Sequence, residues 1–402
     1  MGSVTPHSTP TRTSPPYPLH PSILPHLDPV YHTFYNTHLI NSQVVHHQPL
    51  SVSRSSAILL PGASDPVSVG EVRDLQIPQP CSSKKINEQE EGEDKSGNES
   101  RIPIRAFIPA APTPKGGWPL CMYFHGGGWV LGGIDTENTV CSNLCKRGKV
   151  VVVTVDYRLA PEPPYPAALN DCQTALLHLL THPALLPINP SLLALAGSSA
   201  GGNIAAVLSH RLTSLELCSD FLGQNFPPPK LQLLIVPVMD NTAMPSEFDS
   251  GKSSLSASSS SSSISSSSSA SSSSTPGTNS YPSWTQNQHT PALPAAKMLW
   301  FRQHYLPSPH TWSEPGASPL LHSSGWENLP RTLVVVGGLD VLRDEGVKYA
   351  EKVGKEKCKL VEWEGMPHPF LAMDGVLKQG AETISYMVEE LRDVFWKDRE
   401  SR

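Results

Sequence analysis

The sequence predicts an α/β fold with a mostly parallel central sheet and helices on both of its faces. Two observations carry this prediction. From residue 118 onward, short strand-like segments alternate with helix-like segments, and most of the strand-like segments are apolar along their whole length. Strands of that kind are buried on both faces, which is typical of parallel sheets covered by helices.

The order of the elements follows from the apolar patterns. Two strands come first, at 71–78 and 102–109, and the charged stretch 79–101 between them predicts an enlarged, disordered hairpin connection. The alternating part then predicts further strands and helices in turn. The strands are at 118–124, 149–157, 191–196, 231–240, 332–340 and 358–365, and the helices are at 136–147, 165–182, 200–215, 344–354 and 380–396.

The alternation breaks between residues 241 and 331. A tract within this gap, 253–274, contains 18 serines among its 22 residues and cannot bury a core. We therefore expect 245–280 to be a disordered insertion. The segment 291–307 is helix-like, with Leu299, Trp300 and Tyr305 among its apolar residues.

Two segments are expected to form a helical cap, 23–50 and 281–310. In the first of them, the apolar residues of 23–40 are spaced as in an amphipathic helix. The stretch 1–22 is rich in Pro, Ser, Thr and His and predicts a disordered arm. The remainder, 23–402, is expected to be a single domain.

Charge and cysteine content exclude several classes of protein. A net charge of −6 gives no electrostatic reason to expect a nucleic-acid partner. No apolar run approaches the roughly 18 residues of a spanning helix, and the first residues lack the apolar core of a signal peptide. We therefore expect a cytoplasmic protein without an integral membrane segment. The seven cysteines include Cys141 and Cys145, which we interpret as small buried residues rather than a metal site.

The stretch GSSAG, at 197–201, ends an apolar strand and precedes a helix. It matches G-x-S-x-G, in which a nucleophilic serine occupies a strained strand-to-helix turn and small neighbours let the helix pass close to the strand. The spacing makes Ser199 the candidate nucleophile and Ser198 the variable position. For this motif taken alone, a glycine-rich turn without chemistry is the alternative.

A second motif, HGGG at 125–128, directly follows the expected strand 118–124. Acyl transfer produces an oxyanion that needs preorganised donors, and the backbone N–H groups of a glycine-rich loop can approach it without a Cβ in the way. A phosphate-binding loop is the alternative. The lack of G-x-x-x-x-G-K and G-x-G-x-x-G patterns in the sequence disfavours it.

A serine nucleophile needs a base and a group that orients this base. His368 lies in the loop after the last expected strand, and Asp340 ends the strand before it. With Ser199 they follow the chain order serine, acid, histidine. The rival acids are Asp344, which we place in a first helical turn, and Asp240, one strand earlier.

Six motifs together resemble the hormone-sensitive-lipase-like family of α/β-hydrolases, in the expected order over residues 110–395. They are HGGGW (125–129), DYRLAPE (156–162), YPAALND (165–171), GSSAGGN (197–203), GLDVLRDEG (338–346) and GMPHPF (365–370). The resemblance implies an α/β-hydrolase fold with a cap, and a triad of Ser199, Asp340 and His368 that needs no metal or cofactor. It also implies an oxyanion hole formed by the N–H groups of Gly127, Gly128 and Ala200.

Two positions depart from the pattern of this family. The family usually has aspartate where Ser198 stands, so we expect altered hydrogen bonding at the turn with the nucleophile retained. The sequence HPF replaces the common His-Gly-Phe, so we expect Pro369 to stiffen the histidine loop. Asp156, Arg158 and Glu162 are interpreted as scaffold, with recognition of substrate charge as their alternative role.

We therefore expect a serine carboxylesterase that acts through an acyl-enzyme on Ser199. Trp129, Trp300 and Phe370 are candidates to line an apolar pocket, with a plain core role as their alternative. Such a pocket suits small, fairly apolar esters, for example acetylated metabolites. An amidase or formamidase with the same triad is the nearest alternative. A non-catalytic ligand receptor on this fold, or an interaction protein acting through the Pro/Ser-rich segments, are the others.

Overall fold

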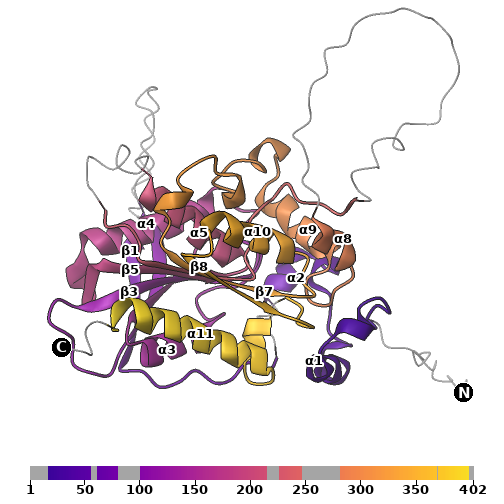
Figure 1. The fold of residues 1–402 in the computed structure, drawn as a ribbon, viewed down its shortest axis with the longest axis horizontal. Helices are drawn as coiled ribbons and strands as arrows, with labels where there is room; N and C mark the ends of the chain where they lie inside the picture. The colour runs from indigo at the N-terminus through magenta and orange to yellow at the C-terminus, as the bar shows by residue number, and fades with distance from the viewer. Residues whose placement is uncertain are drawn as a thin grey trace, which may run out of the picture.

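The computed structural model describes residues 17–55, 61–79, 100–214, 226–246, 281–368 and 370–397. Within these ranges the strands form one eight-stranded sheet with the order β1-β2-β4-β3-β5-β6-β7-β8 (Figure 1). Its β1–β2 and β2–β4 pairings are antiparallel and the others are parallel, which confirms the mostly parallel sheet. The strands are β1 (Glu71–Pro78), β2 (Arg101–Ile108), β3 (Trp118–Phe124), β4 (Val151–Val155), β5 (Ile188–Ser198), β6 (Leu231–Ile235), β7 (Arg331–Gly337) and β8 (Cys358–Trp363).

β1 and β2 form the predicted hairpin. Their residues pair continuously, from Glu71 opposite Ile108 to Pro78 opposite Arg101. The predicted insertions fall mostly outside the described residues, since 80–99 and 247–280 are not among them. The same holds for the first 16 residues of the expected N-terminal arm.

Helices cover both faces of the sheet, as predicted (Figure 1). α4 (Ala167–Thr181), α5 (Ala200–Thr213) and α10 (Arg343–Val353) lie on one face, and α3 (Asn138–Gly148) and α11 (Lys378–Phe395) on the other. Each face has its own hydrophobic core. In β4, Val151 and Val153 belong to one core and Val152 to the other, because side chains of a strand alternate between faces. This explains why the sequence of β4 is apolar without interruption.

The core beneath α3 and α11 contains residues that the sequence singled out. Cys141 and Cys145 of α3 are buried there as free thiols, which confirms their interpretation as small core residues. The apolar stripe of α11 faces the same core. Its buried members are Ile384, Met387, Val388, Leu391 and Phe395.

Residues 23–40 do not form one amphipathic helix, and that prediction was wrong. They form the 3₁₀ turn η1 (Leu24–His26), α1 (Pro29–Phe34) and the π-helical turn η2 (Tyr35–Leu39). The break lies at Asp28, whose side chain accepts hydrogen bonds from the N–H groups of Val30 and Tyr31 as a helix N-cap. Pro29 has no N–H and suits the first position of a new helix, so the chain starts again there.

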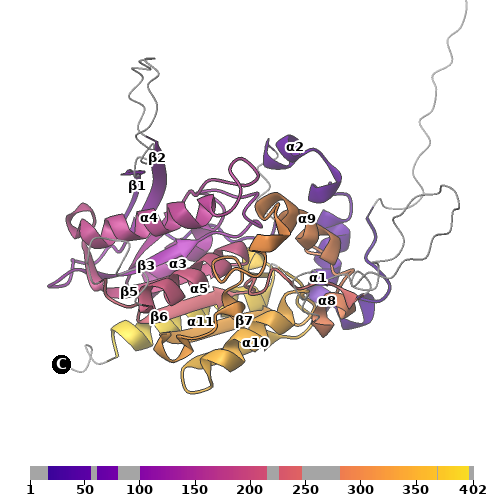
Figure 2. The same cartoon turned by 90° about the horizontal axis from the view of Figure 1, so that it is seen from above.

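The other expected cap segment contains α8 (Pro282–Gln286) and α9 (Ala295–Tyr305). α9 contacts η3 (Val45–His47), which precedes α2 (Leu50–Ser55), so the two segments predicted to form a cap meet in space (Figure 2). Leu299 and Trp300, expected as apolar contacts of α9, are only half-buried. The buried residues of this helix are Ala295, Met298, Phe301, Arg302 and Tyr305.

The remaining short helices are 3₁₀ turns in the connections. They are η4 (Pro183–Leu185), η5 (Pro309–Thr311), η6 (Pro319–Leu321), η7 (Trp326–Asn328) and η8 (Phe370–Met373). Among the described residues, no helix combines the length and the apolar character that crossing a membrane requires.

A buried histidine makes the stability of the fold depend on pH. His210 of α5 is 3% exposed and stacks on His322 with ring centroids 4.0 Å apart. Burial, with the charges of His322 and Lys352, lowers the pKa of His210 from 6.5 to about 3. Between about pH 6.5 and pH 3, the His210 imidazole is protonated in the unfolded chain and neutral in the folded chain. The free energy of unfolding therefore falls as the pH drops through this window.

We expect His210→Phe to remove this dependence while keeping an aromatic ring in the stack. Between pH 7.5 and pH 5, its free energy of unfolding should fall by about 2 kcal/mol less than that of the wild type. Chemical denaturation at both pH values measures the difference. His26→Gln, at an exposed position, should follow the wild type. A His210→Phe curve parallel to that of the wild type would contradict the prediction.

Candidate active site

The three residues of the candidate triad lie in loops at one edge of the sheet. Ser199 directly follows β5, Asp340 comes three residues after β7, and His368 follows β8. These strands run parallel within the sheet, so their carboxyl ends lie at the same edge. Ligands of open α/β sheets bind at that edge.

Ser199 occupies a sharp turn between β5 and α5. Its backbone has φ 53° and ψ −117°, a conformation that is strained for a residue with a side chain. Gly197 and Gly201 make the turn possible: a Cβ on Gly197 would lie 2.4 Å from the carbonyl carbon of Gly201, and one on Gly201 would lie 1.9 Å from the carbonyl oxygen of Phe124. The requirement for small residues, inferred from the sequence, thus has a direct steric cause.

His368 and Asp340 form a buried pair. Nδ1 of His368 lies 2.7 Å from Oδ2 of Asp340, and both residues are at most 6% exposed. The other carboxylate oxygen of Asp340 accepts the N–H of Leu342 at 3.0 Å, and its backbone carbonyl accepts the Asn287 side chain at 2.9 Å. The carboxylate is therefore held in place, and the imidazole presents Nε2 as its second nitrogen.

The two rival acids have other partners. Asp344 accepts hydrogen bonds from the Ser283 N–H and the Arg343 guanidinium, both at 2.7 Å. Asp240 accepts the hydroxyl of Tyr281 at 2.7 Å. Of the three acids considered from the sequence, the structure brings Asp340 to the histidine.

The glycine-rich loop after β3 has a backbone that requires glycine. φ is +113° at Gly127 and +60° at Gly128, and a Cβ on Gly127 would lie 2.2 Å from the carbonyl oxygen of Leu131. Within the described residues, no acceptor takes the N–H of Gly127 or Gly128. These two donors are therefore available to an external oxygen.

His125, the first residue of the HGGG motif, supports this loop from within. Its ring stacks on Tyr157 with centroids 4.1 Å apart, and its Nδ1 lies 2.7 Å from the carbonyl oxygen of Gly126. Burial lowers the pKa of His125 to about 4, so the imidazole is neutral at pH 7. A neutral ring that donates from Nδ1 fixes the carbonyl of Gly126 and with it the course of the loop.

The aromatic residues proposed from the sequence lie in different surroundings. Trp129 is fully buried and stacks on Tyr305 at 4.2 Å, and Phe370 is buried in the core under α11. Trp300 is half-buried on α9. These positions fit the core role for Trp129 and Phe370, while a pocket-lining role remains a prediction for all three.

Sequence reasoning missed Phe301, which lies directly on the glycine-rich loop. A Cβ on Gly128 would lie 2.3 Å from the Phe301 ring, so this ring packs against the glycine. The contact joins positions far apart in the chain, and only the apolar character of 291–307 pointed toward it. It brings α9 directly over the loop.

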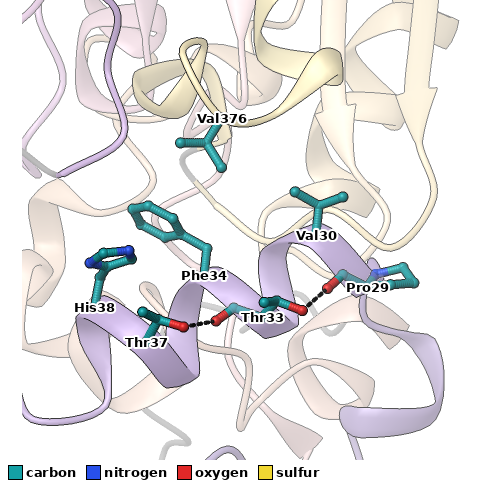
Figure 3. A pocket seen from close by; sticks show the side chains of 7 residues that line it. All are labelled: Pro29, Val30, Thr33, Phe34, Thr37, His38 and Val376. Carbon is teal, nitrogen blue, oxygen red and sulfur yellow. Dashed lines mark hydrogen bonds between the residues drawn. The ribbon is translucent and has the colours of Figure 1, made fainter.

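A surface groove lies elsewhere, between α1 and the loop that precedes α11. Phe34 and Val30 of α1 face Val376 across it (Figure 3). None of the triad residues lines this groove. It is lined by Pro29, Val30, Thr33, Phe34, Thr37, His38 and Val376.

Ser198, where the family usually has aspartate, is bonded to an acid that sequence reasoning also missed. Its hydroxyl donates to Oε1 of Glu137 at 2.5 Å. We expected altered hydrogen bonding at this turn. In the structure, the carboxylate at the turn belongs to Glu137, the residue before α3, and not to residue 198. In the sequence, only the place of Glu137, 12 residues after His125, put this acid near the glycine-rich motif. Pro369 lies outside the described residues.

Two of the residues interpreted as scaffold, Arg158 and Glu162, form ion pairs. Arg158 donates to both carboxylate oxygens of Asp171, at 2.8 and 2.7 Å. Glu162 accepts from Arg54 at 3.0 Å, and Arg54 also donates to the carbonyl of Val130 beside the glycine-rich loop. Arg54 of α2 thus contacts both the DYRLAPE segment and the glycine-rich loop, as expected if Glu162 has a scaffold role.

Comparison with known proteins agrees with this geometry. The profile of a family described as alpha/beta hydrolase fold matches residues 121–272 and 267–372. The chain belongs to this family. It is 39% identical to AB hydrolase superfamily protein C1039.03 of Schizosaccharomyces pombe, over 92% of this chain and 94% of that protein.

Other relatives have been named for their activity. Ethyl acetate hydrolase of Pseudomonas putida is 28% identical over 72% of this chain and 78% of its own length. The solved structure of a hyperthermophilic esterase from Pyrobaculum calidifontis superposes with a TM-score of 0.68, at 27% identity, over 92% of this chain and 98% of the other. The resemblance inferred from the motifs is confirmed, and the chain is a carboxylic ester hydrolase by class.

Proposed function

We propose that the protein cleaves small, fairly apolar carboxylic esters through an acyl-enzyme formed on Ser199. The observation that carries this proposal is the 2.7 Å contact between His368 and the buried Asp340, at the sheet edge where the strained Ser199 lies. A nucleophile, a base and a group that orients the base are the parts that acyl transfer requires.

In the proposed reaction, Nε2 of His368 takes the proton of the Ser199 hydroxyl while Oγ attacks the ester carbonyl carbon. Asp340 keeps Nδ1–H directed toward itself and stabilises the imidazolium. The oxyanion accepts hydrogen bonds from the N–H groups of Gly127, Gly128 and Ala200.

The imidazolium then protonates the leaving alcohol as the C–O bond breaks. A water molecule, deprotonated by the same histidine, attacks the acyl-enzyme, and collapse of the second tetrahedral intermediate returns the proton to Ser199 and releases the acid.

The preference for small substrates is inferred from α9. The Phe301 ring packs on Gly128, next to the position of the oxyanion. An aromatic ring this close to the carbonyl leaves little room beside it, which favours short acyl groups such as acetyl. The name of the Pseudomonas relative, an ethyl acetate hydrolase, supports the same substrate size. The role we infer is removal of short acyl groups from small apolar alcohols.

The amidase or formamidase alternative uses the same triad and differs in its leaving group. The receptor alternative is disfavoured because all three triad positions are occupied by residues that can act. A receptor that does not transfer protons does not require the hydrogen-bonded pair of His368 and Asp340.

Two measurements test this function. We expect p-nitrophenyl acetate and butyrate to be hydrolysed with a kcat/KM at least about tenfold above that of the dodecanoate, and p-nitroacetanilide and a formanilide to be cleaved far more slowly. A p-nitrophenyl alkylphosphonate should label one residue, Ser199, as found by peptide mass spectrometry. Faster cleavage of an anilide would favour the amidase, and an inert, unlabelled protein would favour the receptor.

A further inference from the structure

Glu137, the residue before α3, directs its carboxylate toward the candidate active site. Oε1 accepts the hydroxyl of Ser198 at 2.5 Å, and Oε2 accepts the N–H of Gly126 at 3.2 Å. Both oxygens thus accept from a donor, which is the arrangement that suits the ionised form of the acid.

These two donors belong to the two halves of the site. Gly126 begins the glycine-rich loop, and Ser198 ends β5 immediately before Ser199. The halves are also in contact, since a Cβ on Gly126 would lie 2.8 Å from Oγ of Ser198 and 3.5 Å from Cβ of Ser199. The carboxylate of Glu137 therefore joins the oxyanion loop to the turn that carries the nucleophile.

The carboxylate of Glu137 also interacts electrostatically with His368, the candidate base. Burial has the largest effect and raises the pKa of Glu137 overall, while the hydrogen bonds from Ser198 and Gly126 and the charge of His368 act in the opposite direction. The last effect means that ionised Glu137 and protonated His368 attract one another. Position 198, where the resemblance implies aspartate, holds a neutral residue here, and its hydroxyl is bonded to the carboxylate of Glu137.

We propose that Glu137 is a positioning residue that locks the oxyanion loop to the nucleophile turn and stabilises the imidazolium of His368 through its negative charge. This inference rests on the proposed function, because it assigns Glu137 a part in the same reaction. The groups that interact with the carboxylate are Tyr123 of β3, Cys141 of α3, Ser198 and His368, and Asp340 is in turn paired with His368.

Glu137→Gln isolates the charge. The amide oxygen can accept the N–H of Gly126 while the amide nitrogen donates to Oγ of Ser198, so both links persist without the negative charge. We expect kcat for p-nitrophenyl acetate to fall roughly tenfold or more, with KM within about threefold of the wild type. We also expect the acidic limb of kcat/KM against pH to move to lower pH, because the variant lacks the negative charge beside the site.

A double variant tests whether a carboxylate at position 198 can replace that of Glu137. Glu137→Gln combined with Ser198→Asp returns a carboxylate to the position that the family usually uses, and we expect it to restore the acidic limb and most of kcat. Asp135→Asn, a neighbouring exposed acid that pairs with Arg105, is the matched control and should leave kcat and the pH profile within about twofold.

The outcomes separate the two proposals. A wild type without esterase activity or phosphonate labelling would contradict the proposed function itself. An active, labelled wild type whose Glu137→Gln variant keeps the same kcat and acidic limb would overturn the role of Glu137 alone. Loss of kcat in a folded Glu137→Gln variant without movement of the limb would overturn the electrostatic part of the proposal. Should Glu137→Gln fail to fold, the Ser198→Asp double variant decides through the same pH profile.

Discussion

Replacing Ser199 with alanine is expected to lower kcat/KM for p-nitrophenyl acetate by about 10⁴-fold or more. The nucleophile has no substitute within the turn, because the neighbouring Ser198 donates its hydroxyl to Glu137. Only the residual effect of the oxyanion hole and of substrate binding should remain. Initial rates corrected for spontaneous hydrolysis measure the loss.

Ser209→Ala is the matched control for this variant. Ser209 is buried in α5, the helix that follows Ser199, and its hydroxyl donates to the carbonyl of Ala205 at 2.9 Å. It should retain the activity of the wild type. Ser198→Ala should lose no more than about tenfold, since it removes a hydrogen bond and not the nucleophile. Equal loss in Ser198→Ala and Ser199→Ala would contradict the assignment of the nucleophile.

The parts of the fold that could be predicted are those governed by contacts along one element. Val151, Val152 and Val153 are all buried because β4 has a core on each side, and an uninterrupted apolar run reports this directly. Gly197 and Gly201 have no room for a Cβ in a turn of five residues. A local motif therefore predicted the strained turn at Ser199 without knowledge of the rest of the chain.

What the sequence could not provide are contacts between distant elements. Phe301 packs on Gly128, and Glu137 bonds Ser198 across 61 positions, so no periodicity within one helix indicates either contact. Arg302 shows the same limit: it is 1% exposed between Trp284 and Trp312, with its guanidinium carbon 5.2 and 5.3 Å from their rings. A hydrophobic pattern places an arginine on the outside of α9, whereas the two indole rings hold it inside.

The broken helix at 23–40 has a different cause. The spacing of apolar residues there is that of a helix, but Asp28 and Pro29 form a strong local start signal within it. Asp28 caps a new helix that starts at Pro29, and the turn before it does not continue as a helix. Local hydrogen-bond chemistry overrode periodicity at this point, and the signal was present in the sequence as an Asp-Pro pair.

Replacing Asp340 with asparagine is expected to lower kcat by about 10³- to 10⁴-fold, with little change in KM. The carboxylate accepts Nδ1–H of His368 at 2.7 Å and the N–H of Leu342 at 3.0 Å. An asparagine that keeps its oxygen on Leu342 turns its amide N–H₂ toward the histidine. The imidazole must then carry its proton on Nε2, which cannot accept the proton of Ser199.

Asp344→Asn tests whether the acid has been assigned correctly. Asp344 lies only four residues further on, is half-buried, and accepts from Ser283 and Arg343 instead of the histidine. This variant should keep kcat within about threefold of the wild type. Thermal unfolding of both variants separates a lost fold from lost chemistry. Both substitutions remove one negative charge from the stretch between β7 and the first turn of α10. A larger loss of kcat in Asp344→Asn than in Asp340→Asn would mean that proximity to His368 does not identify the acid of the triad.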